Sequence, residues 1–243
     1  MKTHGGIGIA VAMMALVSVA TAGQAREAVK YMTKAKQLSK EESADLRAKL
    51  GACLVDKSKD TVGKLLANSD SLGTDFAAMG VAQPQMIMFS FRMDLCQKFN
   101  NPQVTGPLFV KPGALRNLLM EGAYLTKYGA AVPKPMLNEK GEPALAPARN
   151  FVSKGDLLPQ VYAYAQLADC TAANGPELAD KLLRTPAGLP AEREAAVALA
   201  PVIGQCVTQG QDIKLTQDTI RAIAAEGLWQ RYVYAPKPAQ ASK

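Results

Sequence analysis

Apolar residues recur at helical spacing through most of the chain. After Ser39, three leucines follow at intervals of four positions, Leu46, Leu50 and Leu54, so they share one face of a helix. Ser39 is followed three positions later by Glu42, a capping-box pattern that marks the first turn of a helix. The sequence therefore predicts a helix that begins directly after Ser39.

A second helix is predicted over residues 190–206, and a third over residues 220–232. Pro190 suits a first helical turn, because the N–H that proline lacks would be unpaired there anyway. Glu192 then lies near the positive end of the helix dipole. Pro201 is expected to kink this helix or to restart it.

Two similar phrases, LRNLLMEGAYLTKY and IRAIAAEGLWQRY, stand near the ends of the two halves of the chain. Arg116 and Glu121 of the first match Arg221 and Glu226 of the second. A glycine follows each glutamate, and an aromatic residue lies three positions beyond it. Each half also carries a cysteine, a pair of leucines and a second cysteine before its phrase. The pattern indicates a tandem duplication with copies the size of a small domain.

The duplication predicts how the four cysteines pair. Four cysteines allow three pairings, and disulfides are favoured over free thiols if the chain is exported. If the two copies fold alike, the bonds are Cys53–Cys96 and Cys170–Cys206, because these cysteines occupy matching places. In the chain-entropy model, each bond would stabilise the fold by roughly 4 kcal/mol.

The segment QMIMFSFRMDLC fits two secondary structures. Its alternating apolar residues are typical of a strand, whereas Met86, Phe89 and Met93 fit one face of a helix. Its counterpart in the second half is the predicted helix over residues 190–206. The duplication therefore favours a helix.

The N-terminus has the features of an export signal. After Lys2, residues 7–20 form an uncharged, mostly apolar run that is shorter than the roughly 20 residues of a membrane-spanning helix. Small-x-small cleavage patterns end at Ala22 and Ala25. Residues 1–25 are therefore predicted to be a signal peptide, and the mature chain to be periplasmic or secreted. An uncleaved anchor is the alternative.

The mature chain is expected to be all-α, with two tandem helical repeat units that each contain one disulfide. Residues 26–128 would form the first unit and residues 156–234 the second. Between them, residues 129–155 carry four prolines and three glycines, which predicts a linker or an extended connection along the surface. The tail, residues 235–243, is expected to be disordered.

The composition excludes several kinds of chemistry. The only histidine, His4, lies in the predicted signal peptide, so the mature chain cannot form a Ser-His-Asp or Cys-His site. Motifs for acyl transfer and nucleotide binding are absent, and with neither histidine nor a CxxC pair no metal or cofactor is expected. The formal net charge of +7 has no concentrated block, which suits an anionic envelope component better than nucleic acid.

Within each repeated phrase, the arginine and the glutamate lie five positions apart, or roughly 140° around a helix. They are poorly placed to pair with each other, so each is expected to meet another helix or solvent. The glycine that follows would permit close helix approach. The functional alternative is a recognition surface with aromatic and arginine anchors. Its candidate residues are Glu121, Tyr124, Tyr128, Glu226, Trp229 and Arg231.

The order of cysteine, double leucine, second cysteine and IRAIAAEGLWQRY resembles small exported alphaproteobacterial proteins of the sphingomonad type. The stretch DCTAANGPELADKLLRTPAGLPAEREAAVALAPVIGQC carries most of this resemblance. The first copy departs from it, with a longer stretch between its cysteines and GPLFVKPG before its last helix. The resemblance implies the repeat and the compartment, and no particular activity.

The sequence favours a non-enzymatic protein of the envelope or periplasm that binds another protein or an anionic envelope component. One alternative is a carboxylate-dependent hydrolase of envelope polymers, which requires acidic residues from separate helices to converge. Another is a small-ligand carrier with a cavity lined by Met86, Met88, Phe89 and Phe91. Export, duplication and missing catalytic motifs favour the first reading.

Overall fold

The computed structural model describes residues 39–82, 91, 93–96, 112–144, 146–208 and 213–234. All of them belong to one compact unit, Gln37–Lys243. The predicted signal peptide and C-terminal tail lie outside the described residues, as does most of the segment QMIMFSFRMDLC.

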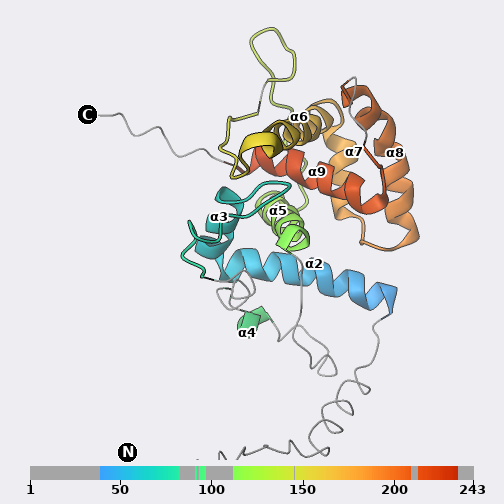
Figure 1. The fold of residues 1–243 in the computed structure, drawn as a ribbon. Helices are drawn as coiled ribbons and strands as arrows, with labels where there is room; N and C mark the ends of the chain where they lie inside the picture. The colour runs from blue at the N-terminus through green and yellow to red at the C-terminus, as the bar shows by residue number, and fades with distance from the viewer. Residues whose placement is uncertain are drawn as a thin grey trace, which may run out of the picture. The chain divides into compact units, whose positions relative to one another are not determined.

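The described part of the chain is all-α, as predicted (Figure 1). Its only extended pairings are two isolated bridges, Ser69 with Thr74 and Leu137 with Pro143. The helices are α2 (Lys40–Lys57), α3 (Lys59–Ala67), α4 (Met93–Cys96), α5 (Pro112–Tyr128), α6 (Leu158–Asn174), α7 (Pro176–Arg184), α8 (Pro190–Cys206) and α9 (Gln217–Tyr232), with a 3₁₀ turn at Gly155–Leu157 before α6.

The predicted helix starts after Ser39 and at Pro190 are confirmed, whereas the helix predicted from residue 220 begins at Gln217. Glu42 N donates to Ser39 Oγ over 3.1 Å, and Ser39 N donates to Glu42 Oε2 over 2.8 Å, which completes the capping box of α2. Helix α8 begins at Pro190 but does not restart at Pro201, which lies inside it. Pro201 removes the donor for the Val197 carbonyl, and Val197 is 65% exposed, so water can take the place of that donor.

Both predicted disulfides are present. Cys53–Cys96 joins α2 to α4, and Cys170–Cys206 joins α6 to α8; the Cα atoms are 5.7 Å apart in each. Each half of the described chain therefore has a long helix bonded to a later helix through a disulfide. The short α3 and α7 follow the first cysteine of each half and carry the leucine pairs, which are buried.

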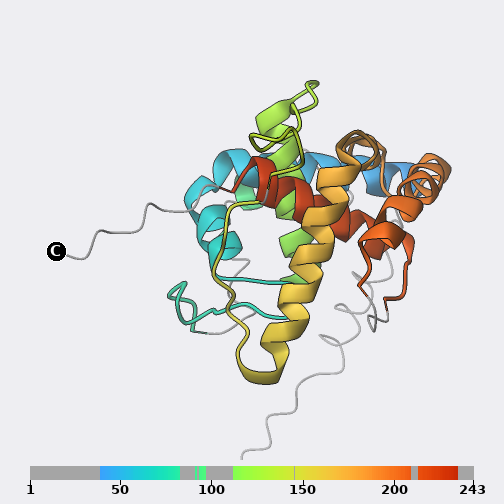
Figure 2. The ribbon, with the colours of Figure 1, turned by 90° about the horizontal axis from the view of Figure 1, so that it is seen from above.

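The glycine of each repeated phrase allows two helices to touch through their backbones. A Cβ atom on Gly122 of α5 would lie 2.8 Å from the carbonyl carbon and oxygen of Gly51 in α2. A Cβ atom on Gly227 of α9 would lie 2.0 Å from the carbonyl oxygen of Ala168 in α6. Figure 2 shows α6 crossing α9 at close range. The expected close approach is confirmed in both halves, because only glycine fits these contacts.

Helices α5 and α9 also pack against each other and carry much of the hydrophobic core. Every residue from Ile223 to Tyr232 of α9 is buried. A helix that is buried all round must place its polar side chains against other protein groups. The charged side chains of α9 therefore have to find their partners inside the protein.

Candidate functional site

The two repeated phrases exchange ion pairs in the protein interior. Arg116 of α5 donates through both terminal nitrogens to Glu226 of α9. Arg221 of α9 donates in turn to Glu121 of α5, with Nε and Nη2 at 2.9 and 2.6 Å from the two carboxylate oxygens. All four side chains are at most 6% exposed. Each charge was expected to meet another helix or solvent, and the structure shows that it meets another helix.

Two arginines from different parts of the chain, Arg116 and Arg149, pair with Glu226. Arg149, from the connection between the halves, places Nη2 2.7 Å from Glu226 Oε1. Arg116 also donates through Nε to Ser69 Oγ over 3.1 Å. Burial by itself would raise the pKa of Glu226, but the two arginines outweigh it and hold that pKa below its ordinary value. Glu226 is therefore a carboxylate locked in its charged form.

The ion pair of Glu121 is enclosed by a different set of partners. Arg221 Nη1 donates to Glu192 Oε1 over 3.0 Å, and the same guanidinium reaches the carbonyls of Leu182, Leu183 and Thr185. The Arg221 guanidinium thus donates to backbone carbonyls at the C-terminal end of α7, where a helix leaves carbonyls without donors from its own backbone. The arrangement is structural, since every polar atom of the Arg221 guanidinium has a protein partner.

The predicted recognition surface is wrong, because its residues lie in the interior. Of the six candidates, five are buried and Tyr128 is half-buried. Tyr124 donates to Asp180 Oδ1 over 2.7 Å, and Tyr128 donates to the Tyr232 carbonyl over 3.2 Å. The buried five are Glu121, Tyr124, Glu226, Trp229 and Arg231. Aromatic and arginine residues at these positions fill a helix interface instead of anchoring an outside partner.

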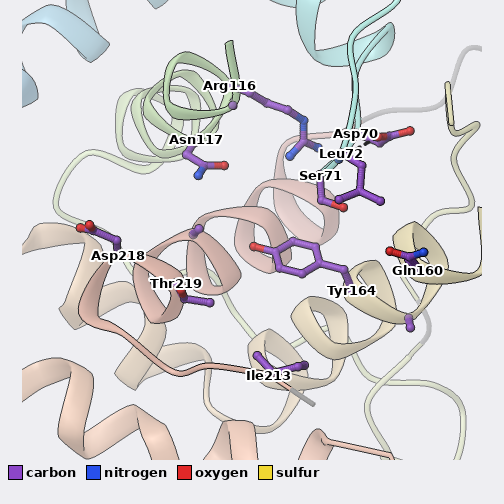
Figure 3. Close-up of a pocket in the computed structure, with 13 residues that line it drawn as sticks. Asp70, Ser71, Leu72, Arg116, Asn117, Gln160, Tyr164, Ile213, Asp218 and Thr219 are labelled. Atoms are coloured by element: carbon purple, nitrogen blue, oxygen red, sulfur yellow. Dashed lines mark hydrogen bonds between the residues drawn. The ribbon is translucent and has the colours of Figure 1, made fainter. Parts of the chain in front are cut away.

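An open pocket of about 590 Å³ lies above the Arg116–Glu226 pair. It is bounded by the first turns of α5 and α9, by α6 and by the loop after α3 (Figure 3). Asn117, Ser71 and Tyr164 extend into it. Its walls combine polar and apolar side chains. The neutral polar ones are Ser71, Asn117, Gln160, Tyr164 and Thr219, and the larger apolar ones are Leu72 and Ile213.

Two carboxylates border this pocket, but they do not converge. Asp70 accepts five hydrogen bonds, all between 2.8 and 3.0 Å, from Leu72, Gly73, Val152 and Ser153. Burial alone would raise its pKa, yet these donors hold the pKa below the ordinary value. Asp218 stands on the opposite wall, in the first turn of α9 (Figure 3). Asp70 thus anchors the connection between the halves and is unsuited to donate a proton.

Among the described residues, two hydroxyl groups of the pocket make no hydrogen bond to another protein group. The Ser71 hydroxyl is buried and has no hydrogen-bond partner within the described structure. Burial raises the pKa of Tyr164 well above its ordinary value, and the Glu226 charge adds to this effect. The Tyr164 hydroxyl therefore stays protonated and can donate a hydrogen bond at any physiological pH.

A second pocket of about 520 Å³ lies over the Glu121–Arg221 pair. Most of its charged side chains are in ion pairs: Glu121 with Arg221 and Arg47, Arg184 with Asp180 over 2.7 Å, and Asp45 with Lys49. The pocket above Arg116 is the better candidate site, because among the described residues its Ser71 and Tyr164 hydroxyls make no hydrogen bond to the protein.

Sequence reasoning did not find this pocket. Arg149 and Asp70 lie in irregular segments that have no periodicity, and Tyr164 sits on a helix face that reads as ordinary packing. The one usable signal for Asp70 is its place in the turn sequence SDSLG, where aspartate often accepts backbone hydrogen bonds. Of the cavity predicted from Met86, Met88, Phe89 and Phe91, only Phe91 lies in the described residues, and it is buried.

No protein-family model, curated protein or solved structure matches the chain. In the part of the chain that the structure describes, no group of three or more His, Cys, Asp or Glu side chains is placed to hold a metal ion. No helix in that part is long and apolar enough to cross a membrane.

Proposed function

We propose that this chain is an exported, non-enzymatic binding protein of the bacterial envelope, and that the pocket above Arg116 is its ligand site. The observation that carries the proposal is the pocket itself, with the Ser71 and Tyr164 hydroxyls in its lining over the Arg116–Glu226 ion pair. Sites for small molecules are concave and largely pre-formed, and they carry a few polar groups on apolar walls.

Export is supported by the two disulfides, since such bonds persist in oxidising compartments. The predicted signal peptide and the resemblance to sphingomonad-type exported proteins point the same way. A protein partner or an anionic envelope component remains a prediction for the outer surface. The residues first considered for that surface lie inside, so the pocket is the stronger basis for a function.

A binding role is preferred to hydrolysis because of the two carboxylates at the pocket. A carboxylate-dependent hydrolase needs one acid with a raised pKa and a second carboxylate facing it across the substrate. Asp70 has a lowered pKa and five hydrogen-bond donors. Asp218 lies across the pocket from it. The geometry therefore offers positioning groups and no acid–base pair.

The test is a ligand search with a blocked pocket. Oxidised mature protein would be equilibrated with a small-molecule extract of the periplasm, and bound compounds identified by native mass spectrometry. Ala222→Trp, in the pocket wall, should abolish the retained signal. Ala198→Trp, at an exposed position of α8, is the matched control and should retain it. If Ala222→Trp retains the same compounds, the pocket is not the site.

A further inference from the structure

We infer that the pocket above Arg116 binds a neutral, hydroxyl-rich ligand of mono- to disaccharide size. The inference rests on the proposed function and names the chemistry of its ligand. It follows from the charge balance of the pocket, from the kind of polar groups left free in it, and from its size.

The formal charges of the ionic groups beneath the pocket balance, so no net charge there favours a charged ligand. Arg116 donates hydrogen bonds from Nε to Ser69 and from Nη1 and Nη2 to Glu226. The positive charges of Arg116 and Arg149 face the negative charges of Glu226 and Asp70, which act on both arginines. Asp218, which borders the pocket, is exposed, where water screens its charge. An anionic ligand would lose its hydration without gaining an unpaired cation in the pocket lining, and a cationic one would meet only the water-screened Asp218.

The free polar groups of the pocket can both donate and accept hydrogen bonds. The Ser71 hydroxyl and the Tyr164 hydroxyl each do both, and the Asn117 amide offers donors and an acceptor side by side. A ligand hydroxyl has the same dual character, so several hydroxyls on one ring match such a set. Leu72 and Ile213 supply apolar contact for the C–H face of a sugar ring.

The size of the pocket agrees with this class. Its volume is about 590 Å³, in the middle of the range typical of small-molecule sites, roughly 300–1,000 Å³. The loop side of the pocket is open near Leu72, which is 51% exposed. A free sugar or the end of a polysaccharide would present the same chemistry at this opening.

The experiment compares ligands of equal size and different charge. Oxidised mature protein would be titrated with D-glucose, trehalose and N-acetyl-D-glucosamine, and with D-glucuronate and D-glucosamine as charged counterparts, by saturation-transfer NMR. Dextran, a polymer of glucose, would be titrated as well, to test whether the pocket binds the end of a polysaccharide or only a free sugar. We expect at least one neutral sugar to bind about tenfold or more tightly than either charged one, because burying an unpaired charge is costly.

Variants locate the binding within the pocket. Tyr164→Phe and Ser71→Ala each remove one hydroxyl and should weaken sugar binding roughly two- to tenfold, the value of one neutral hydrogen bond. Tyr162→Phe is the matched control on the same helix, because Tyr162 is 52% exposed and outside the pocket lining, and its affinity should not change. Equal thermal melting of the three variants would show that the fold is kept.

Three results would overturn the inference. Binding of glucuronate or glucosamine as tight as that of any neutral sugar would exclude the neutral class and leave the proposed function standing. Binding of an extract compound with no sugar in the panel bound would do the same. If neither the panel nor the extract yields a ligand that Ala222→Trp abolishes, both the inference and the proposed function fail.

Discussion

Arg116 and Glu226, which are 110 positions apart in the sequence, form a bidentate ion pair that is almost wholly removed from water. Arg221 and Glu121, at the matching positions of the two phrases, repeat the relationship in reverse. Each half of the chain therefore supplies the counter-charge that the other half needs. Since an unpaired buried charge is expensive, neither phrase is complete without its partner.

Removing the charge of Glu226 should destabilise the fold strongly. Glu226→Gln keeps the shape of the side chain but leaves Arg116 and Arg149 buried beside a neutral group. We expect the free energy of unfolding to fall by about 3–5 kcal/mol, measured by urea denaturation at pH 7. Glu139→Gln, at an exposed position, should change it by less than about 0.5 kcal/mol. Equal effects of the two substitutions would contradict the role given to Glu226.

Two glycine-to-alanine substitutions should have opposite effects on the stability of the fold. Gly227→Ala would place a Cβ atom 2.0 Å from the Ala168 carbonyl oxygen, so α9 must move away from α6. We expect a loss of roughly 3 kcal/mol or more, or failure to fold. Gly204→Ala, inside α8 with nothing within 4 Å of the new atom, should stabilise the protein by about 0.5–1 kcal/mol. Melting temperatures of the two variants measure the contrast; a stable Gly227→Ala protein would contradict the close helix contact.

Stability should decline in acid. The pKa values of Asp70 and Glu226 are lowered in the folded state, so their contribution is complete above the pKa values of the unfolded chain, about 4. It is lost as the pH falls through the lower, folded values. We expect the free energy of unfolding to change little from these groups between about pH 5 and 8 and to drop below about pH 4.

The contribution of Asp70 to this acid sensitivity can be isolated. Asp70→Asn should be less stable at pH 7 and should lose less on acidification than the native protein. Asp45→Asn, which removes an exposed carboxylate that pairs with Lys49, should follow the native curve. Parallel curves for Asp70→Asn and the native protein would show that Asp70 does not titrate as described.

Loss of either disulfide should lower the free energy of unfolding by a similar amount. Cys53–Cys96 spans 43 residues and Cys170–Cys206 spans 36, so the entropy that each removes from the unfolded chain is nearly equal. Replacing either pair with alanine should cost about 2–5 kcal/mol, measured by urea denaturation of each double variant. A difference between the two of more than roughly 2 kcal/mol would indicate that strain or packing, and not loop entropy, governs one of them.

Local sequence determined where α2 and α8 begin, and comparison of the two halves determined how the cysteines pair. Ser39 with Glu42 and Pro190 mark helix starts through contacts made within one turn, so no distant residue is needed. The disulfide pairing followed from matching positions in the two halves. The spacing of Arg116 and Glu121 was enough to predict that each meets something beyond its own helix.

Only the tertiary structure decided what each of these residues meets. Helical periodicity fixes which side chains share a face, but not which face of another helix will cover it. For that reason the sequence left open whether Trp229 and Glu226 pack inside or form a recognition surface, and the structure places them in the interior. Arg149 and Asp70 lie in irregular segments, and their partners are set by where the chain folds back. The pocket above Arg116 exists only because α5, α6 and α9 meet there, an outcome of packing that no local pattern encodes.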